Sequence, residues 1–435
     1  MEIGAATISP RDPDRERGGS TRLDRRVLLA WCLYDFANSW YVAVIPATIW
    51  SAYYATYVVG NETGLGDAWW GRVVSATMLF VAVTSPVLGS VADHLGIRKG
   101  LLIGYALASI AATALLATVE RGMILYGFVL SFVANVGFEG SLLFYNAYLP
   151  EIAPRAYQGR VSGWGFGTGY AGSFLALLCA LPLVSAGRYD QAFLLVAAAY
   201  LVFIVPAWIW LPAQRRSTLG FVAAATEGVR GTWRTFRDIL KIRPLRRFLL
   251  AYFLFEDGVN TVIFFSSIFA KTTLGFPMPD LIKLFLLVQA SALVGAFLWA
   301  RPTDRWGPKR VLMIMLVQWV LVIVAGYLVR TPTQFFVIAA VAGTGLGPVQ
   351  AAARTFMSTL IPHGREGEFF GFYTLCGKSA SVLGPLLFGT VSYATGGNQR
   401  LALLSILPLF VLGGLMLGGV RAGGPTEAAR PLAPP

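Results

Sequence analysis

Long apolar runs recur along the whole sequence, and they constrain the fold more than any other feature. About twelve runs reach roughly 20 residues, the length that an α-helix needs to cross a hydrocarbon core about 30 Å thick. Hydrophobic residues make up 56% of the chain and charged residues 13%, so little polar sequence is left for a separate soluble domain. The sequence therefore predicts an all-α polytopic membrane protein.

The apolar runs fall into two groups of six, separated by a long polar loop. The approximate spans are 27–58, 69–92, 100–119, 122–148, 160–183, 190–211, 246–270, 281–301, 310–329, 332–358, 369–394 and 398–421. We therefore expect a cytoplasmic tail at 1–26, a six-helix bundle at 27–211, a linker at 212–245, a second six-helix bundle at 246–421 and a disordered tail at 422–435.

The predicted linker contains an amphipathic segment. One helical face carries Val229, Trp233, Phe236 and Leu240, and the next carries Arg230, Arg234, Arg237 and Lys241. This pattern predicts a helix that lies on the inner leaflet, in contact with anionic lipids.

The distribution of basic residues predicts the orientation. The formal net charge is +13, and most Lys and Arg residues lie in the N-terminal tail, the linker and alternate short loops. The positive-inside rule then places both termini and the linker in the cytoplasm. Because the basic residues follow loop order rather than forming one surface, we expect no nucleic-acid partner. The three cysteines have no ligand spacing, so we expect no metal and no cofactor.

Two motifs occur twice, which indicates an internal duplication. The first run contains Asp35-x-x-Asn38-Ser39, and the seventh contains Asp257-x-x-Asn260-Thr261. The turn after the second span, residues 89–99, is similar to the turn after the eighth, residues 304–310. Because six helices is an even number, both halves enter the membrane from the same side, as parallel repeats do.

The repeated turn carries a family resemblance. Gly89-x-x-x-Asp93-x-x-Gly96-x-Arg98-Lys99 resembles the signature loop of the major facilitator superfamily, although His94 replaces the usual basic residue and Ala300 stands where the second copy would have its first Gly. The segment from Trp31 to Ser39 further resembles the vacuole-effluxer-like branch, which includes autophagy-related vacuolar amino-acid effluxers and bacterial relatives.

The resemblance implies the function. It implies a secondary active transporter that moves an amino-acid-like or other small organic solute by alternating access, in the direction of efflux, with protons as a candidate coupling ion. We expect a monomer in a bacterial inner membrane. A channel or a non-transporting receptor stays open as an alternative. So does an intramembrane enzyme that uses Asp35 and Asp257 as a carboxylate pair, although we expect no enzyme.

Charged side chains inside the membrane are the candidate transport residues, because each costs about 2.5–3.5 kcal/mol at a helix centre. Asp35, Glu139, Asp257 and Lys378 each lie about nine residues, or roughly 13 Å, from the cytoplasmic end of their span. They therefore share one layer near the midplane. The resemblance implies that helices 1, 4, 7 and 10 line a central cavity. The polar residues of these helices complete the candidate substrate or coupling-ion set: Asn38, Asn260, Gln350 and Arg354.

Charge suggests a role for each candidate. Burial favours the neutral form of a carboxylic acid and a nearby cation favours the carboxylate, so Asp35, Glu139 and Asp257 could exchange protons during the cycle. Lys378 or Arg354 could bind a substrate carboxylate or neutralise an acidic neighbour. The alternative is that these groups form buried ion pairs that fix helix register. The segment Gly343–Pro348 also predicts a break in helix 10.

The two signature turns predict a gate. Asp93 and Asp304 each lie at a cytoplasmic helix end, where a carboxylate can accept hydrogen bonds from a helix N-terminus and pair with Arg98 or Arg305. Lys99, Lys309 and Arg310 complete the predicted gating set. The alternative is that the basic residues only enforce topology.

Overall fold

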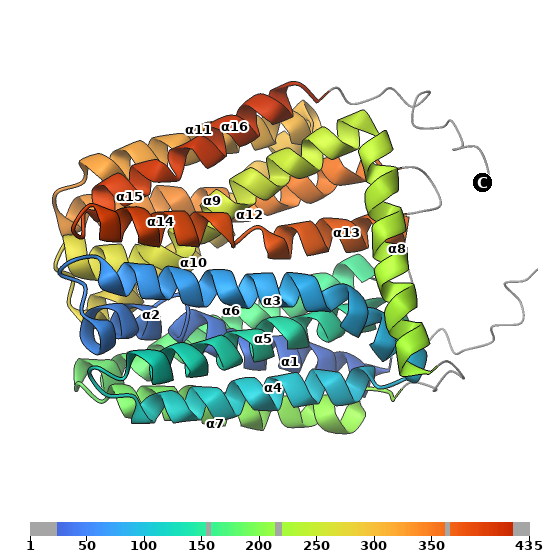
Figure 1. Ribbon diagram of the computed structural model, residues 1–435, viewed down its shortest axis with the longest axis horizontal. Coiled ribbons are helices and arrows are strands. Elements are labelled where there is room, and N and C mark those ends of the chain that lie inside the picture. Colours follow the sequence, from blue (N-terminus) through green and yellow to red (C-terminus); the bar gives the residue numbers. More distant parts are fainter. Residues whose placement is uncertain (1–23, 154–157, 214–219, 362–365, 421–435) are drawn as a thin grey trace, which may run out of the picture.

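The computed structural model describes residues 24–153, 158–213, 220–361 and 366–420, and almost all of them are helical. Residues 1–23 of the predicted N-terminal tail and the predicted tail at 422–435 lie outside the described residues. The long helices lie roughly side by side, and a single helix, α8, crosses one end of the molecule (Figure 1).

The first half of the chain supplies six spans. They are formed by α1 (Arg25–Val44) with α2 (Ile49–Tyr53) and the π-helical turn η1 (Tyr54–Val59), α3 (Leu65–Leu95), α4 (Arg98–Leu115) with the 3₁₀ turn η2 (Leu116–Thr118), α5 (Ile124–Ile152), α6 (Gln158–Ser185) and α7 (Tyr189–Trp210). The first span is interrupted at Pro46, which has no backbone N–H and cannot continue the helical hydrogen bonds. Ser267 of the other bundle donates to the freed carbonyl of Ala47 at 2.7 Å.

The second half repeats this arrangement. Its spans are α9 (Arg243–Thr273), α10 (Met278–Trp306), α11 (Pro308–Leu328), α12 (Pro332–Ser358), α13 (Glu366–Ser379) with α14 (Leu383–Ala394), and α15 (Gln399–Ser405) with α16 (Leu407–Gly418). Among the described residues, eleven helices are long and apolar enough to cross a membrane. The eleventh predicted span, 369–394, is present as the two halves α13 and α14.

The break between α13 and α14 frees backbone groups inside the membrane, and side chains of α9 bond them. The Asp257 carboxylate accepts from Leu383 N at 3.1 Å and from Gly384 N at 2.9 and 3.0 Å. Asn260 Nδ2 donates to Ala380 O at 2.9 Å. The second copy of the repeated motif therefore binds both sides of the break, which the membrane requires because no water is present to do so.

The break also connects the two bundles. Ser75 Oγ of α3 donates to Val382 O at 2.7 Å. Gly384 approaches α9 so closely that a Cβ there would meet Thr261 Oγ1. Only glycine fits this contact, so Gly384 is required where α14 begins.

The predicted break in helix 10 is wrong, because α12 runs without interruption from Pro332 to Ser358. Its glycines instead allow close packing on α10. A Cβ on Gly343 would lie 2.8 Å from Ser291 Cβ of α10. In the other direction, a Cβ on Gly295 of α10 would clash with the backbone of Thr344 in α12. Small residues at a helix contact are a common way to bring backbones together in membranes.

Helix α8 (Phe221–Lys241) supplies the amphipathic segment predicted in the linker. It packs on α3, where Ser90 Oγ donates to Ala224 O at 2.7 Å, and on α13, where Phe236 stacks on Phe372 with 6.1 Å between ring centroids. Val229 and Trp233 are more than half exposed on its other side. Helix α8 therefore contacts both bundles at one end of the molecule (Figure 1).

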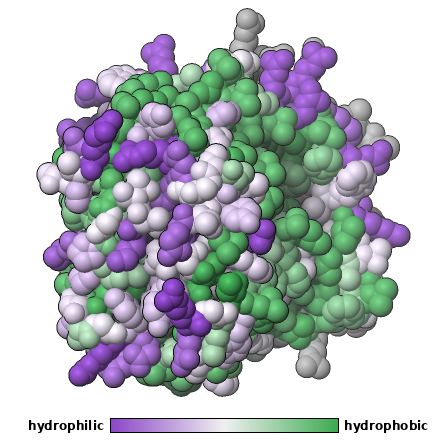
Figure 2. Space-filling view, turned by 60° about the vertical axis from the view of Figure 1, so that its left-hand side comes forward, coloured by the Kyte–Doolittle hydropathy of each residue, from purple (hydrophilic) through white to green (hydrophobic). Residues whose placement is uncertain are grey.

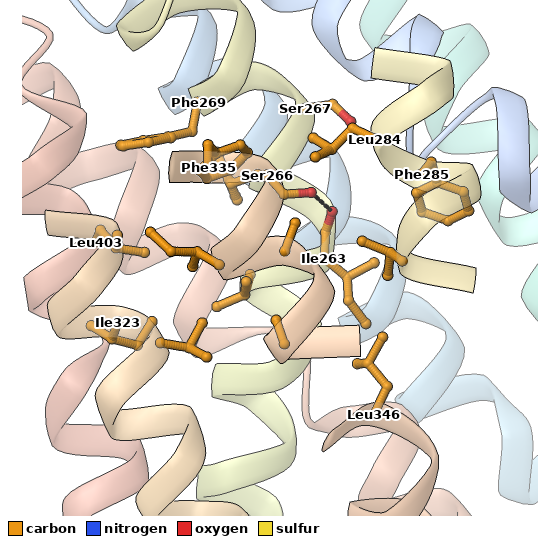
Figure 3. Close-up of a pocket in the computed structure, with 18 of the residues that line it drawn as sticks. Ile263, Ser266, Ser267, Phe269, Leu284, Phe285, Ile323, Phe335, Leu346 and Leu403 are labelled. Atoms are coloured by element: carbon orange, nitrogen blue, oxygen red, sulfur yellow. Dashed lines mark hydrogen bonds between the residues drawn. The ribbon is translucent and has the colours of Figure 1, made fainter. Parts of the chain in front are cut away.

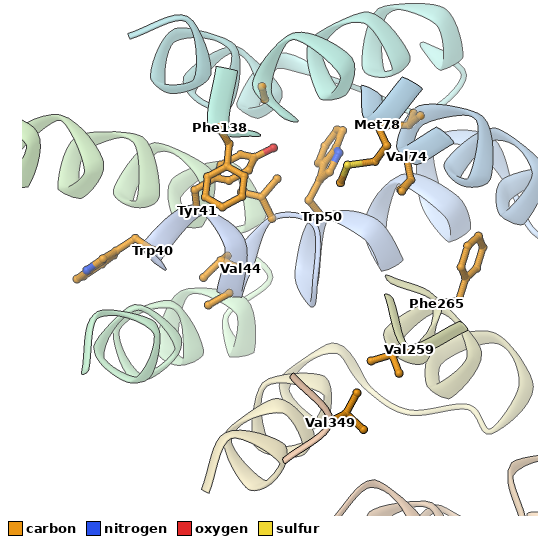
Figure 4. Packing of buried hydrophobic residues seen from close by; sticks show 14 of the residues in the cluster. Trp40, Tyr41, Val44, Trp50, Val74, Met78, Phe138, Val259, Phe265 and Val349 are labelled. Carbon is orange, nitrogen blue, oxygen red and sulfur yellow. The ribbon is translucent and has the colours of Figure 1, made fainter. Parts of the chain in front are cut away.

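The buried core extends through both bundles. Figure 4 shows Trp50, Val74 and Phe138 of the first half in the same region as Val259 and Val349 of the second half. Large apolar side chains are also exposed along the flanks, among them Phe297 and Leu415. Figure 2 shows hydrophilic residues gathered at the end opposite α8, beside a hydrophobic flank. This division is typical of a protein whose flanks face lipid.

We predict that Asp257→Ala lowers the stability of the folded protein by roughly 1–3 kcal/mol, because it leaves the N–H groups of Leu383 and Gly384 without an acceptor inside the membrane. The measurement is thermal unfolding of the purified protein in detergent. Asp190→Ala is the matched control, since Asp190 is an exposed acid in the first turn of α7. Equal melting temperatures for the two variants would contradict the assigned role of Asp257.

Candidate functional site

An ion pair joins the two bundles near the middle of the membrane. Glu139 lies halfway along α5, and Lys378 lies in the last turn of α13, next to the helix break. Lys378 Nζ is 2.6 Å from Glu139 Oε2, and the side chains are 36% and 9% exposed. Sequence analysis placed both residues in one layer, and the structure brings them into contact.

A cavity of about 440 Å³ lies beside this pair. Residues of α3, α5, α8 and α13 line it, and its polar side chains include Asn146, Thr235 and Thr374 as well as the ion pair. Because α8 forms one wall, the cavity lies toward the α8 end. Neither Asp35 nor Asp257 is among the described residues that line it.

Glu256 also lies near Lys378, and it is not among the candidate residues predicted from the sequence. Its side chain is buried in α9, and its Oε2 has no hydrogen-bond partner among the described residues. Lys378 places a positive charge near it, and the Gln350 side chain lies within hydrogen-bonding reach. Lys378 therefore pairs with a carboxylate of the other bundle and also acts electrostatically on one of its own. The sequence signal that could have identified Glu256 is the pair of adjacent acids, Glu256 and Asp257, inside an apolar run.

Asp35 has few partners, in contrast to Asp257. It is half-buried, and Asn38 Nδ2 lies 3.4 Å from its Oδ1. The backbone of α6 passes beside the carboxylate, since a Cβ on Gly169 would lie 2.7 Å from Asp35 Oδ2. Asp35 thus lies against α6 while Asp257 lies against α14, so the two copies of the motif have different neighbours.

Aromatic rings surround the first copy of the motif. Tyr145 of α5 stacks on Trp31 and Tyr34 of α1, with ring centroids 4.5 and 5.1 Å apart. The Tyr145 hydroxyl is buried without a hydrogen-bond partner in the described part of the chain. Rigid rings therefore hold the helix turn that carries Asp35.

The remaining candidates of helix 10 lie on α12. Gln350 and Arg354 are exposed on α12. The positive charge of Arg354 acts on the Tyr373 hydroxyl of α13, so Arg354 lies near the helix that carries Lys378. Arg354 can therefore contribute a second cation to the region, while Asn260 is occupied at the helix break.

The predicted gating residues Lys99 and Lys309 make equivalent contacts in the two bundles. Lys99 Nζ donates to Leu211 O at 2.7 Å, at the end of α7. Lys309 Nζ donates to Gly418 O at 2.9 Å and Val420 O at 2.6 Å, at the end of α16. Each lysine thus bonds the free carbonyls at a helix C-terminus of its own bundle, which favours a capping role.

The other predicted gating residues are placed differently. Arg98 Nη1 lies 2.6 Å from Glu151 Oε1 and donates to Ala147 O at 3.1 Å, both on α5. The side chain of Asp93 lies outside the described part of the chain. The rest of the set, Asp304, Arg305 and Arg310, is exposed. A latch formed by these residues therefore stays a prediction.

A second cavity, of about 160 Å³, lies inside the C-terminal bundle (Figure 3). Its lining is mostly apolar and includes Phe269, Leu284, Ile323, Phe335 and Leu403. Ser266 also lines it, but its hydroxyl donates to Ile263 O of its own helix at 3.1 Å. This cavity offers little to orient a polar solute, so the cavity at the Glu139–Lys378 pair is the better candidate site.

Comparison with known proteins agrees with this architecture. The sequence matches the family described as "Vacuole effluxer Atg22 like" over residues 72–159 and 154–424. It is 29% identical over 414 residues to the uncharacterized MFS-type transporter YxiO of Bacillus subtilis, covering 92% of this chain and 96% of the relative. It is 24% identical over 441 residues to autophagy-related protein 22 of Coccidioides immitis, covering 81% of this chain and 72% of the relative.

Solved structures share the fold at low sequence identity. The nucleoside transporter NupG superimposes with a TM-score of 0.69 at 15% identity, over 91% of this chain and 98% of that one. The D-xylose-proton symporter superimposes with a TM-score of 0.66 at 16% identity, over 91% and 97%. These likenesses confirm the predicted twelve-helix fold of the major facilitator superfamily.

The family match covers most of the chain, and its relatives and structural neighbours are transporters rather than enzymes. The chain therefore belongs to the vacuole effluxer Atg22-like family and is a secondary transporter of small molecules within the major facilitator superfamily.

Proposed function

We propose that this transporter exports a zwitterionic, amino-acid-like solute by alternating access, with protons as the coupling ion. The observation that carries the proposal is the Glu139–Lys378 pair, which joins the two bundles beside a cavity. The cavity volume of about 440 Å³ falls within the roughly 300–1,000 Å³ that is typical of small-molecule sites.

The chemistry of the pair selects the solute class. A zwitterion has a carboxylate that can replace Glu139 at Lys378 and an ammonium group that can replace Lys378 at Glu139. Both charges then stay compensated, whereas removing one partner would leave the other charge unpaired. A solute with one charge would leave one protein charge unpaired, so it should bind less well.

The same exchange of partners couples binding to movement. Glu139 and Lys378 lie in different bundles, so their contact opposes separation of the bundles at the α8 end. A solute that takes both partners removes this restraint. The free energy gained when the solute binds then also shifts the equilibrium between the inward-facing and outward-facing states.

Asp35 is the proposed proton-carrying group. Asp257 bonds a broken helix and Glu139 forms an ion pair, so a change of protonation at either would disturb a structural contact. Among the described residues, the Asp35 carboxylate accepts a long hydrogen bond from Asn38 at 3.4 Å. Its protonation can therefore change at little structural cost.

Export and a cytoplasmic location of both termini fit the family description and the distribution of basic residues. In this orientation the α8 end faces the cytoplasm, and the Glu139–Lys378 cavity lies on the cytoplasmic side of the membrane. The exposed face of α8, with Val229 and Trp233 beside basic residues, would then contact anionic lipids.

The transport site is tested by counterflow in proteoliposomes preloaded with a panel of L-amino acids and with analogues that lack either charge. We expect saturable exchange for at least one zwitterion, and a loss of about tenfold or more in Lys378→Gln. Lys283→Gln is the control, because Lys283 pairs with Asp280 at an exposed helix end. Exchange by Lys378→Gln at the wild-type rate would refute the site. A channel would give no saturable exchange, and an enzyme would alter the compound.

Proton coupling is tested separately with Asp35→Asn. We expect this variant to keep counterflow, since the solute site is intact, but to lose accumulation driven by a pH gradient. Asp190→Asn serves as the control, because that acid is exposed at a helix end. Uphill transport by Asp35→Asn under the same gradient would show that another group carries the proton.

A further inference from the structure

Asp67 is a fully buried carboxylate at the end of the molecule opposite α8. It lies in the first turn of α3, and three side chains donate to it. Ser392 Oγ lies 2.5 Å from Oδ2, Gln399 Nε2 lies 2.8 and 2.9 Å from the two oxygens, and Asn61 Nδ2 lies 3.0 Å from Oδ1. Asn61 comes from the N-terminal bundle, while Ser392 and Gln399 come from the C-terminal bundle.

Further bonds fix the orientation of both amide side chains. Asn61 Oδ1 accepts from Asp67 N at 3.0 Å, and Gln399 Oε1 accepts from Thr273 Oγ1 at 2.6 Å. Each amide oxygen thus has its own donor, which leaves each amide nitrogen directed at the Asp67 carboxylate. The amide groups cannot turn over without losing these bonds.

The backbones around Asp67 are in close contact. A Cβ on Gly64 would lie 2.7 Å from the backbone of Ser392, and one on Gly389 would lie 2.6 Å from Asp67 O. Gly397 faces Glu62 O in the same way at 2.8 Å. The two bundles are therefore in close backbone contact at this end, around the Asp67 network.

The network is built for a carboxylate and not for a carboxylic acid. An amide nitrogen has no lone pair available to accept a proton, so a protonated Asp67 could not donate to Asn61 or Gln399. The hydroxyl of Ser392 is the acceptor left among its three partners. Protonation therefore forces the Ser392 bond to reverse and weakens the bonds from Asn61 and Gln399, because a hydrogen bond to an ionised group is stronger than one to a neutral group.

No ion pair among the described residues includes Asp67. The charged residues near this end of the surrounding elements are Glu62 before α3, Arg72 in α3, Lys271 near the end of α9 and Arg400 in α15. The Arg72 guanidinium lies over the Trp69 ring, 5.1 Å from its centroid, and Arg400 Nη1 donates to Tyr327 O at 2.7 Å. Asp67 is thus held by neutral donors, and a proton is the ligand that can neutralise it.

We propose that Asp67 is a proton-operated latch, which holds the bundles together at the end opposite α8 while it is ionised and releases them when it binds a proton. This site is separate from Asp35 and from the Glu139–Lys378 pair. The latch controls whether the end opposite α8 is open or closed. Its action therefore does not depend on which class of solute the protein transports.

The test is a distance measurement between spin labels at Arg121→Cys and Arg330→Cys, in a background without native cysteines and in lipid nanodiscs. Both positions are exposed in loops at the Asp67 end, one in each bundle. At neutral pH we expect a short distance in the otherwise unchanged protein, and a longer one once the pH is lowered far enough to protonate the Asp67 carboxylate. Asp67→Asn should give the longer distance at both pH values, with the open fraction raised about tenfold or more at neutral pH.

The control Glu62→Gln should keep the short distance at neutral pH and the response to acid. A second label pair at the α8 end, Ala213→Cys and Thr359→Cys, separates latch opening from general expansion, since opening should not lengthen that distance. An unchanged distance in Asp67→Asn, or an acid response that persists in it, would overturn the proposal. So would lengthening at both ends.

Ser392→Ala provides a milder variant if Asp67→Asn does not fold. It removes one donor and should move the midpoint of opening to higher pH, because the ionised form loses a hydrogen bond. A midpoint that is unchanged or lower would contradict the latch. Because these measurements need no solute, they can succeed or fail independently of the transport assays.

Discussion

The broken eleventh helix imposes the constraint on which the rest of the structure depends. Inside a membrane, every backbone N–H and C=O freed by a break must find a partner in the protein. Here Asp257 and Asn260 of α9 and Ser75 of α3 supply those partners. The break in turn ends α13 one residue after Lys378, so the lysine lies in mid-membrane where it can reach Glu139 of the other bundle. One structural requirement thus positions the candidate transport site.

Much of this arrangement could be predicted from periodicity and charge alone. Twelve apolar spans, the linker helix and the shared layer of Glu139 and Lys378 follow from helix geometry and the cost of burying charge. The repeat could not reveal that its copies differ, because Asp35 and Asp257 stand in the same motif. What separates them is the neighbouring helix: α6 is continuous beside Asp35, whereas α14 begins beside Asp257. The predicted break at Gly343–Pro348 failed because those glycines serve helix packing.

Two buried acids escaped prediction for different reasons. Asp67 looks like an ordinary acid in a first helical turn, and its partners Ser392 and Gln399 lie more than 300 residues away in sequence. Glu256 adjoins Asp257, and only the packing of α9 against α12 and α13 shows that it faces Lys378 and Gln350. The two ends of the molecule thus use different chemistry. An ion pair that a zwitterion can replace lies toward α8, and a carboxylate that a proton can neutralise lies at the other end.

The proposed solute binds by replacing both partners of the Glu139–Lys378 pair. Thermal stabilisation of the purified protein by a panel of amino acids tests this binding mode most directly, since a ligand that binds only the folded state raises its stability. We expect that a zwitterion stabilises the wild type, that analogues lacking either charge do so far less, and that Glu139→Gln with Lys378→Gln abolishes the effect. Equal stabilisation of the wild type and this double variant would contradict it.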